Sequence, residues 1–244
     1  MPLYRDDGVV LRTIRLGEAD RIVTLATAGH GKVRAVVKGV RKTKSRFGGR
    51  LEPLTHVACL LYEGRELDVV TQAETLDHFR AVRDDLDRVS RATAMLEAVD
   101  QVLQEREPNH RVYQMLVGAL RALAAPEVLP ALIVPAFFLK LLAAEGVAPL
   151  LDRCASCGTP APALVGGLVA FDLGQGGGLC RSCRRGAAVS PDAFALLRQI
   201  LGGGLNEALR QPASGASWEV EHLASQAMEY HLERRLRSLH VLDR

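Results

Sequence analysis

The sequence predicts an α+β protein in which a small closed β-barrel is followed by an α-helical domain with an inserted cysteine module. Three observations predict this fold class. Short β-type runs crowd the N-terminal third, the hydrophobic period changes from strand to helix near Asp77, and two Cys-x-x-Cys pairs lie further along the chain. We expect domains at residues 1–78 and 79–244, with the cysteine module at about residues 150–188.

The barrel is predicted from five runs rich in Val, Leu, Ile and Thr, which glycine-containing breakers separate. Five short strands with hairpin-like spacing suit a small closed barrel, and a five-stranded OB-fold has this size. An SH3-like barrel or a plain meander is the alternative. The expected strands are Val9–Arg15, Ile22–Thr27, Lys32–Val37, His56–Tyr62 and Leu67–Ala73.

The helical domain is predicted from apolar residues that recur at helical spacing, with Asp and Arg on the opposite face. The third helix is apolar nearly all round, so we expect it to be central and buried, and Gly146 ends it. Ser190 as N-cap and Pro191 as the first helical residue predict the start of a later helix. The expected helices cover residues 86–103, 112–123, 131–145, 191–201 and about 217–239.

The last helix carries two large aromatic residues, Trp218 and Tyr230, which we expect to pack in the interior. It ends in an arginine cluster formed by Arg234, Arg235 and Arg237. Helix C-termini favour cations, so this cluster does not by itself indicate nucleic-acid contact.

The segment from Arg21 to Leu51 has nine basic residues and no acidic ones. Surface charge runs are usually mixed in sign, whereas this one would attract a polyanion, because neutralising phosphates releases condensed counterions. Charge is uneven along the whole chain as well: residues 1–80 hold 14 basic and 10 acidic side chains, and the remainder holds 17 and 18. The predicted nucleic-acid-binding residues, which the family resemblance described below assigns to DNA, are Lys32, Arg34, Lys38, Arg41, Lys42, Lys44, Arg46 and Arg50.

One aromatic residue, Phe47, lies within the basic loop that follows the third strand. It could stack on a base, but a single aromatic is a poor stacking platform, so the interior of the barrel is the favoured place for its ring. Few interleaved aromatics also favour backbone-driven, sequence-tolerant binding of nucleic acid.

The cysteine pairs Cys154/Cys157 and Cys180/Cys183 are separated by 22 residues. Each pair can hold one edge of a tetrahedron, and four thiolates with no open position predict one structural Zn²⁺ per chain. The span between the pairs is typical of a hairpin with a Gly-rich turn. A zinc deaminase would need His-x-Glu before a Pro-Cys-x-x-Cys pair, which is missing here, and redox cycling explains two such pairs less well. Cys59 stands alone in a strand and is expected in the core.

Catalytic signatures are missing from the sequence, so we expect a protein that is not an enzyme. No complete phosphate-binding Gly-x-x-x-x-Gly-Lys-[Ser/Thr] loop and no Gly-x-Ser-x-Gly elbow occurs. The start MPLYRDDG is polar, so we expect no secretory signal, and the apolar run Val128–Ala144 is short for a membrane span and contains two prolines and Lys140. We therefore expect a cytoplasmic protein with no membrane partner.

With these features in order, the chain resembles the RecO family of bacterial DNA repair proteins, which are recombination mediators. The resemblance spans nearly the whole chain, and the basic loop together with the cysteine quartet makes it specific. The matching stretches are Val9–Leu25, Gly31-Lys32, Val37–Lys42, Ser45-Arg46, Leu51–Leu54, the module from Cys154 to Cys183, and Arg237–Leu239.

The resemblance implies binding of single- and double-stranded DNA, annealing of complementary strands, and assistance in loading recombinase onto coated strands. It implies RecR as a partner, with RecF indirectly and the acidic tail of single-strand-binding protein as further ones, and a location at the bacterial nucleoid. The residues leave two other classes open. One is a zinc-ribbon RNA-binding or transcription-associated protein, and the other is a nuclease, which would need clustered carboxylates.

Overall fold

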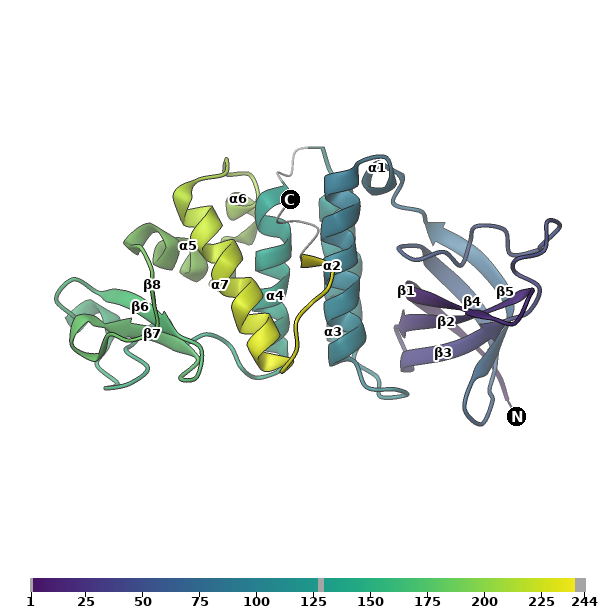
Figure 1. Cartoon of the computed structure of the whole chain (residues 1–244), viewed down its shortest axis with the longest axis horizontal. Coiled ribbons are helices and arrows are strands. Elements are labelled where there is room, and N and C mark those ends of the chain that lie inside the picture. Colours follow the sequence, from purple (N-terminus) through teal and green to yellow (C-terminus); the bar gives the residue numbers. More distant parts are fainter. Residues whose placement is uncertain (1, 127–129, 240–244) are drawn as a thin grey trace. The chain divides into compact units, whose positions relative to one another are not determined.

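The computed structural model describes residues 2–126 and 130–239 (Figure 1). Contacts divide the chain into two compact units, Met1–Ala124 and Ala125–Asp243, which are described separately as unit 1 and unit 2. Among the described residues, no helix combines the length and the apolar character that a membrane span requires.

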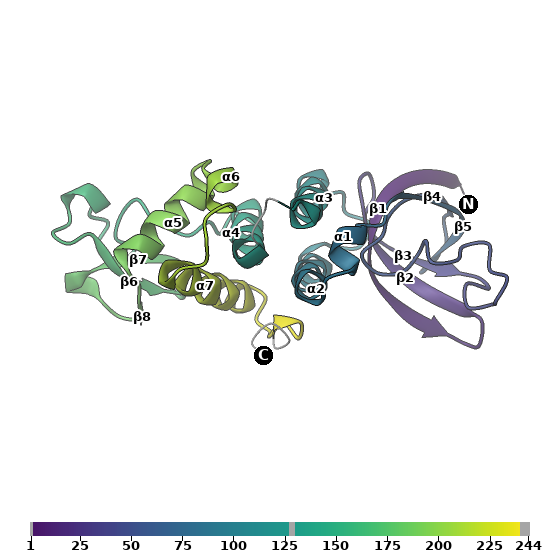
Figure 2. The same ribbon diagram turned by 90° about the horizontal axis from the view of Figure 1, so that it is seen from above.

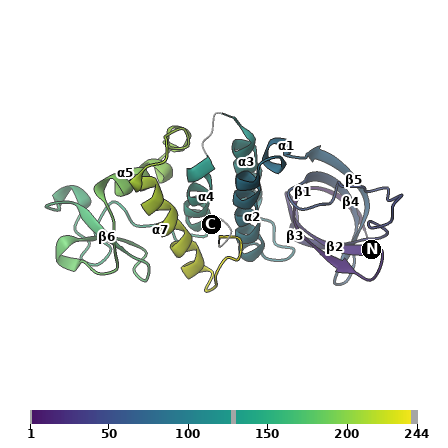
Figure 3. The same ribbon diagram turned by 45° about the horizontal axis from the view of Figure 1, so that its top comes forward.

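Unit 1 begins with a closed five-stranded barrel in the order β1-β2-β3-β5-β4, so the predicted OB-like barrel is confirmed (Figure 3). Only β3 and β5 pair in parallel, and the other neighbouring strands are antiparallel. The strands are β1 Leu3–Leu16, β2 Asp20–Thr27, β3 Gly31–Val37, β4 His56–Tyr62 and β5 Asp68–Asp77.

Strand β1 begins at Leu3, six residues earlier than the predicted start at Val9. The first residues of β1 pair with β4, in a register that sets Leu3 opposite Tyr62. Polar residues such as Asp6 and Asp7 hide this part of the strand from a hydrophobic pattern, because the pairing partner, and not the side chains, makes it a strand.

The barrel interior is filled by alternate strand residues such as Val10, Val23 and Leu61, and by Phe47 and Leu51 from the loop before β4. Strands β1 and β2 each contain a stretch of consecutive buried residues, at 8–11 and 23–27. A strand buried on successive residues is covered on both faces. Helices α2 and α3 supply the second cover, since both contact β1 and β2.

The described residues of unit 1 form the helices α1 Arg80–Arg83, α2 Leu86–Val102 and α3 His110–Ala124. Helices α2 and α3 confirm the helices predicted at residues 86–103 and 112–123. Helix α2 starts with Asp85 as N-cap, whose side chain accepts a hydrogen bond from the Arg88 backbone N–H. The α2–α3 connection lies along β3: the Lys32 backbone N–H donates to the Gln104 carbonyl, and the Arg106 N–H donates to the Lys32 carbonyl.

Gly31 permits this close approach, and we expect Gly31→Ala to destabilise unit 1 by about 2–4 kcal/mol. Its φ is +66°, and an added Cβ would lie 1.9 Å from the Glu107 carbonyl oxygen. Gly17→Ala is the matched control, because Gly17 has a φ of +57° with nothing within 4 Å of an added Cβ. The control should cost only about 1–2 kcal/mol of backbone strain in urea unfolding. Equal losses in the two variants would contradict the close-contact argument.

Unit 2 packs its helices around α4, which is buried on nearly every side as the sequence predicts. Figure 2 shows α4, α5 and α7 close together, and α4 and α5 both contact α7. The Ser190 side chain accepts a hydrogen bond from the Ala193 N–H, which confirms the predicted cap. The elements are η1 Pro130–Leu132, α4 Ile133–Ala144, η2 Ala161–Ala163, β6 Leu168–Asp172, β7 Gly177–Cys180, η3 Arg181–Cys183, β8 Ala187–Ala188, α5 Pro191–Leu201, α6 Leu205–Ala208 and α7 Gly215–His231.

Helix α7 ends at His231, so the predicted extension to residue 239 is wrong. Glu233 adopts a left-handed φ of 52°. The Glu233 N–H donates to the Tyr230 carbonyl and the Arg234 N–H donates to the Glu229 carbonyl, the two bonds of a Schellman stop. The left-handed position of a Schellman motif is usually occupied by glycine. Because Glu233 occupies it here, the sequence gives no signal that the helix ends at this point.

The expectation that Trp218 and Tyr230 pack in the interior is also wrong, since they are 66% and 57% exposed. Helix α7 buries the face that carries Val220, Leu223 and Met228, and both aromatics lie off that face. The two aromatics therefore form part of the surface of unit 2.

Candidate nucleic-acid interface and metal site

The basic loop occupies residues 38–55, between β3 and β4. Phe47 and Leu51, each 2% exposed, anchor it in the barrel core. Its first turn is held against the β1–β2 turn, because the Gly39 N–H donates to the Asp20 carboxylate at 2.7 Å and the Arg41 N–H donates to the Ala19 carbonyl. The loop therefore presents its cations from fixed anchor points.

The three cations of this segment that lie on strands are paired with carboxylates. Arg21 contacts Glu52 at 2.5 Å, and Arg34 contacts Glu105 at 3.5 Å. Lys32 donates to the Asp100 carbonyl at 2.6 Å and lies 3.6 Å from the Asp100 carboxylate. Two predicted DNA-binding residues, Lys32 and Arg34, thus have acidic partners on or next to α2.

The cations on the loop lie at its surface, and none has a carboxylate partner among the described residues. Their contacts are with neutral groups. Arg41 donates to the Gly17 carbonyl at 3.3 Å, and Arg50 donates to the Arg46 carbonyl at 2.7 Å. This set, called the loop cations below, consists of Lys38, Arg41, Lys42, Lys44, Arg46 and Arg50.

Phe47 is a core residue, so the favoured interpretation of its role is confirmed. The Arg46 guanidinium lies 4.9 Å from the centroid of its ring and covers it from outside. A ring enclosed in this way has no open face on which a base could stack.

Asp100 is the residue of this region that the sequence does not reveal. It is 9% exposed and binds Arg12 of β1 at 2.6 Å in addition to Lys32 of β3. The helical pattern of α2 places Asp with the polar face, and only the position of the barrel strands turns this carboxylate into a buried partner for two cations.

The cysteine quartet is assembled as predicted: the sulfur atoms of Cys154, Cys157, Cys180 and Cys183 all lie within 4.8 Å of one another. Four thiolates at about 2.3 Å from a tetrahedral Zn²⁺ would lie about 3.8 Å apart, so this cluster fits a zinc knuckle. The Cys157 and Cys180 sulfurs are 4.0 Å apart. Cys59 lies outside the quartet, in the barrel core, as expected.

Backbone groups shape both knuckles. The Gly158 N–H donates to the Cys154 carbonyl at 2.9 Å, and the Cys180 N–H points to the Cys154 sulfur at 3.5 Å. The predicted hairpin is confirmed as β6 and β7, and β8 adds a third strand that the sequence did not indicate. Because Cys180 is the last residue of β7, this hairpin places it next to the pair Cys154/Cys157.

The thiol pKa values are shifted in opposite directions within the quartet. Burial raises the pKa of Cys154, but hydrogen bonds from the backbone N–H groups of Cys157, Cys180 and Ser156 outweigh it and lower the pKa to about 6. The hydrogen bond with Cys180, followed by burial, raises the pKa of Cys183 to about 11. Four adjacent thiols cannot all ionise without a cation between them, so this donor set fits a metal ion.

The fold and the cysteine cluster define a class of protein with an OB-like barrel, a helical region and a four-cysteine module compatible with a metal. The family model "Recombination protein O N terminal" matches residues 1–79, and "Recombination protein O C terminal" matches residues 83–240. The chain therefore belongs to the RecO family, which acts in DNA repair and recombination.

Three relatives, each named DNA repair protein RecO, show the extent of the similarity. The protein from Nocardioides sp. is 46% identical over 247 residues, covering 99% of this chain and all of the relative. Those from Frankia casuarinae and Streptomyces coelicolor are 47% and 44% identical, and each comparison covers both chains in full.

Proposed function

We propose that this chain binds single- and double-stranded DNA through the loop cations, anneals complementary strands and assists recombinase loading together with RecR. The observation that carries the proposal is the division of charge in the basic segment: carboxylates neutralise the strand cations, whereas the loop cations have no such partner among the described residues. Cations of this kind on an anchored loop can neutralise phosphates without first breaking an ion pair.

Annealing follows from the same chemistry. Two strands repel each other through their phosphates, and cations that contact both strands reduce this repulsion. The enclosed ring of Phe47 favours contact with backbone phosphates over base stacking, which makes binding tolerant of sequence. The proposed role is non-catalytic, and RecF and the tail of single-strand-binding protein are further proposed partners.

The proposed metal is one structural Zn²⁺ held by Cys154, Cys157, Cys180 and Cys183. Four thiolates are the donor set that zinc prefers, and four protein ligands leave no position for a reactive water. The ion would join the two knuckles and so hold the loops of the module together.

The test is the dependence of DNA affinity on salt for the triple variant Arg41→Gln, Lys42→Gln, Lys44→Gln. Each lost phosphate contact with single-stranded DNA lowers the slope of log affinity against log salt by about 0.7. We expect the slope to fall by about 2 and the affinity at 0.1 M salt to fall about 100-fold.

Lys32→Gln is the comparison variant. It should change the slope of log affinity against log salt by less than about 0.7, the value for one phosphate contact, because Lys32 already pairs with Asp100. An unchanged slope in the triple variant would refute the loop assignment. RNA of the same length is measured alongside, and tighter binding of RNA than of DNA would favour an RNA-binding protein instead.

A further inference from the structure

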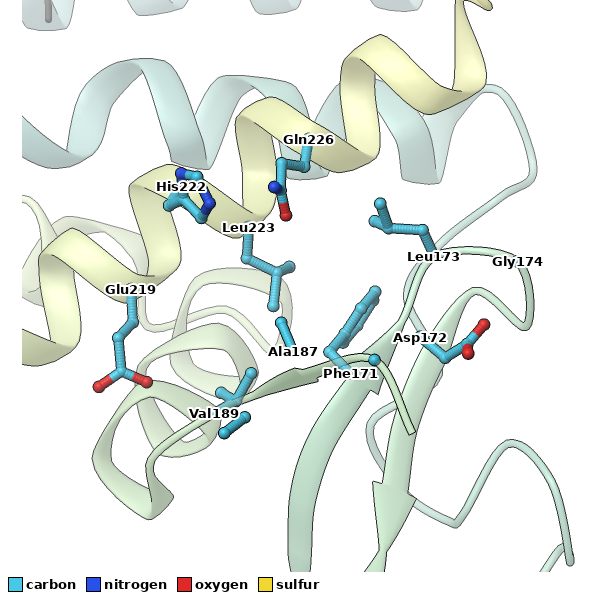
Figure 4. Close-up of a pocket in the computed structure, with 12 residues that line it drawn as sticks. Phe171, Asp172, Leu173, Gly174, Ala187, Val189, Glu219, His222, Leu223 and Gln226 are labelled. Carbon is cyan, nitrogen blue, oxygen red and sulfur yellow. The ribbon is translucent and has the colours of Figure 1, made fainter. Parts of the chain in front are cut away.

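A groove in unit 2 lies between α7 and the hairpin of the cysteine module, and the proposed DNA-binding function makes no use of it. It consists of two adjoining pockets of about 470 Å³ and 500 Å³, which share Phe171, Leu173 and Gly174 in their walls. Figure 4 shows the first pocket, with Leu223 of α7 pointing toward Ala187 and Phe171.

The floor of the first pocket is apolar and well packed. Phe171, Val189 and Leu223 are 3%, 7% and 5% exposed. One wall is formed by residues 186–189, which include β8. Strand β8 is the edge of the sheet β7-β6-β8 and, among the described residues, pairs with β6 alone. Its outer edge can therefore accept another extended chain.

The length of the groove suits a short extended peptide. Its α7 wall runs from Glu219 to His231. Twelve helical steps of 1.5 Å give about 18 Å, and an extended chain covers this distance with about five or six residues at 3.3 Å each.

The charge of the groove indicates what kind of peptide it fits. Asp172, Glu219 and Glu233 line the two pockets together with His222 and His231, and neither pocket is lined by Lys or Arg among the described residues. Asp172 accepts a hydrogen bond from the Gln175 N–H and Glu219 accepts one from the Ser190 N–H, but neither forms an ion pair with a described residue. Figure 4 shows these two carboxylates at opposite ends of the first pocket.

We propose that this groove binds an extended segment of a partner protein in which apolar residues alternate with Lys or Arg. Alternate side chains of an extended chain point to opposite sides, so the apolar ones can enter the floor while the cations reach the carboxylates at the rim. An acidic tail would meet like charge here.

The experiment measures binding of two fluorescein-labelled hexapeptides to the full-length protein by anisotropy, one alternating Lys with Leu and the other alternating Glu with Leu. We expect the Lys/Leu peptide to bind at least tenfold more tightly. Equal binding of the two peptides, preference for the Glu/Leu peptide, or binding of neither would overturn the proposal.

Two kinds of variant locate the binding. Ala187→Arg places bulk and positive charge in the pocket at an exposed position, and it should reduce Lys/Leu affinity at least tenfold. Ala213→Arg makes the same change at an exposed position outside the pocket and should leave the affinity unchanged. The double variant Asp172→Asn, Glu219→Gln keeps the acceptor oxygens, removes the charge and should weaken binding several-fold.

DNA affinity is the independent readout in these variants. It should be the same in Ala187→Arg and Ala213→Arg, so failure of the peptide proposal is distinguishable from failure of the DNA-binding proposal. Equal peptide affinity in Ala187→Arg and in the unsubstituted protein would place any binding elsewhere and overturn the groove assignment.

Discussion

A Cys154→Ser variant is expected to lose the proposed zinc almost completely and to unfold the cysteine module, while the barrel stays folded. Cys154 is fully buried, and its sulfur faces the Cys180 N–H at the junction of the two knuckles. Structural zinc contributes about 10–16 kcal/mol of apparent binding free energy in small zinc modules, and a hydroxyl is a poor substitute for a thiolate. The measurement is metal content by elemental analysis, together with thermal unfolding.

Cys59→Ala is the matched control for this prediction, because Cys59 is the remaining cysteine and lies in the barrel core. The control should keep about one zinc per chain, even if the barrel loses some stability. Zinc retained at full occupancy by Cys154→Ser, or missing from the unsubstituted protein as purified, would contradict the metal assignment.

A Phe47→Ala variant is expected to lose about 3–5 kcal/mol of unfolding free energy, because it empties a large volume in the barrel core. Phe47 is 2% exposed and belongs to the core cluster that includes the strand residues Val37 and Val57. Urea unfolding of the protein, followed by a signal from unit 1, measures this loss.

Two further measurements separate the packing role of Phe47 from base stacking. Phe47→Leu keeps most of the volume and should cost less than about 1.5 kcal/mol. DNA affinity should change little in Phe47→Leu, in which an apolar side chain still anchors the loop in the core, whereas loss of a stacked base would cost about 1–3 kcal/mol of binding. Unchanged stability with weakened DNA binding would show that the ring stacks on a base.

The barrel and most helices could be predicted because their signals are local. Alternation of apolar residues predicts β2, β3 and β4 within two residues of their observed bounds, and Ser190-Pro191 marks the start of α5. The start of β1 was missed because its first residues owe their conformation to pairing with β4. The end of α7 was missed because glutamate occupies the left-handed position of a stop that usually carries glycine.

The candidate sites divide in the same way. Two Cys-x-x-Cys pairs specify a four-thiolate cluster from spacing alone, since each pair forms a compact turn wherever the chain brings it. Whether a cation of the basic segment is free to bind phosphate depends instead on carboxylates that are distant in the sequence. Asp100 lies 68 residues from Lys32, and Glu105 lies 71 residues from Arg34.

By itself the sequence determined the strands β2, β3 and β4, the helical period, the cysteine quartet and the one-signed basic segment, because each is a property of neighbouring residues. Only the tertiary structure decided which cations of that segment pair with carboxylates, that the Asp100 carboxylate is buried, and that a carboxylate-lined groove borders α7. These features arise where distant segments meet, and ion pairing, burial and groove shape depend on distances in space that no local pattern records.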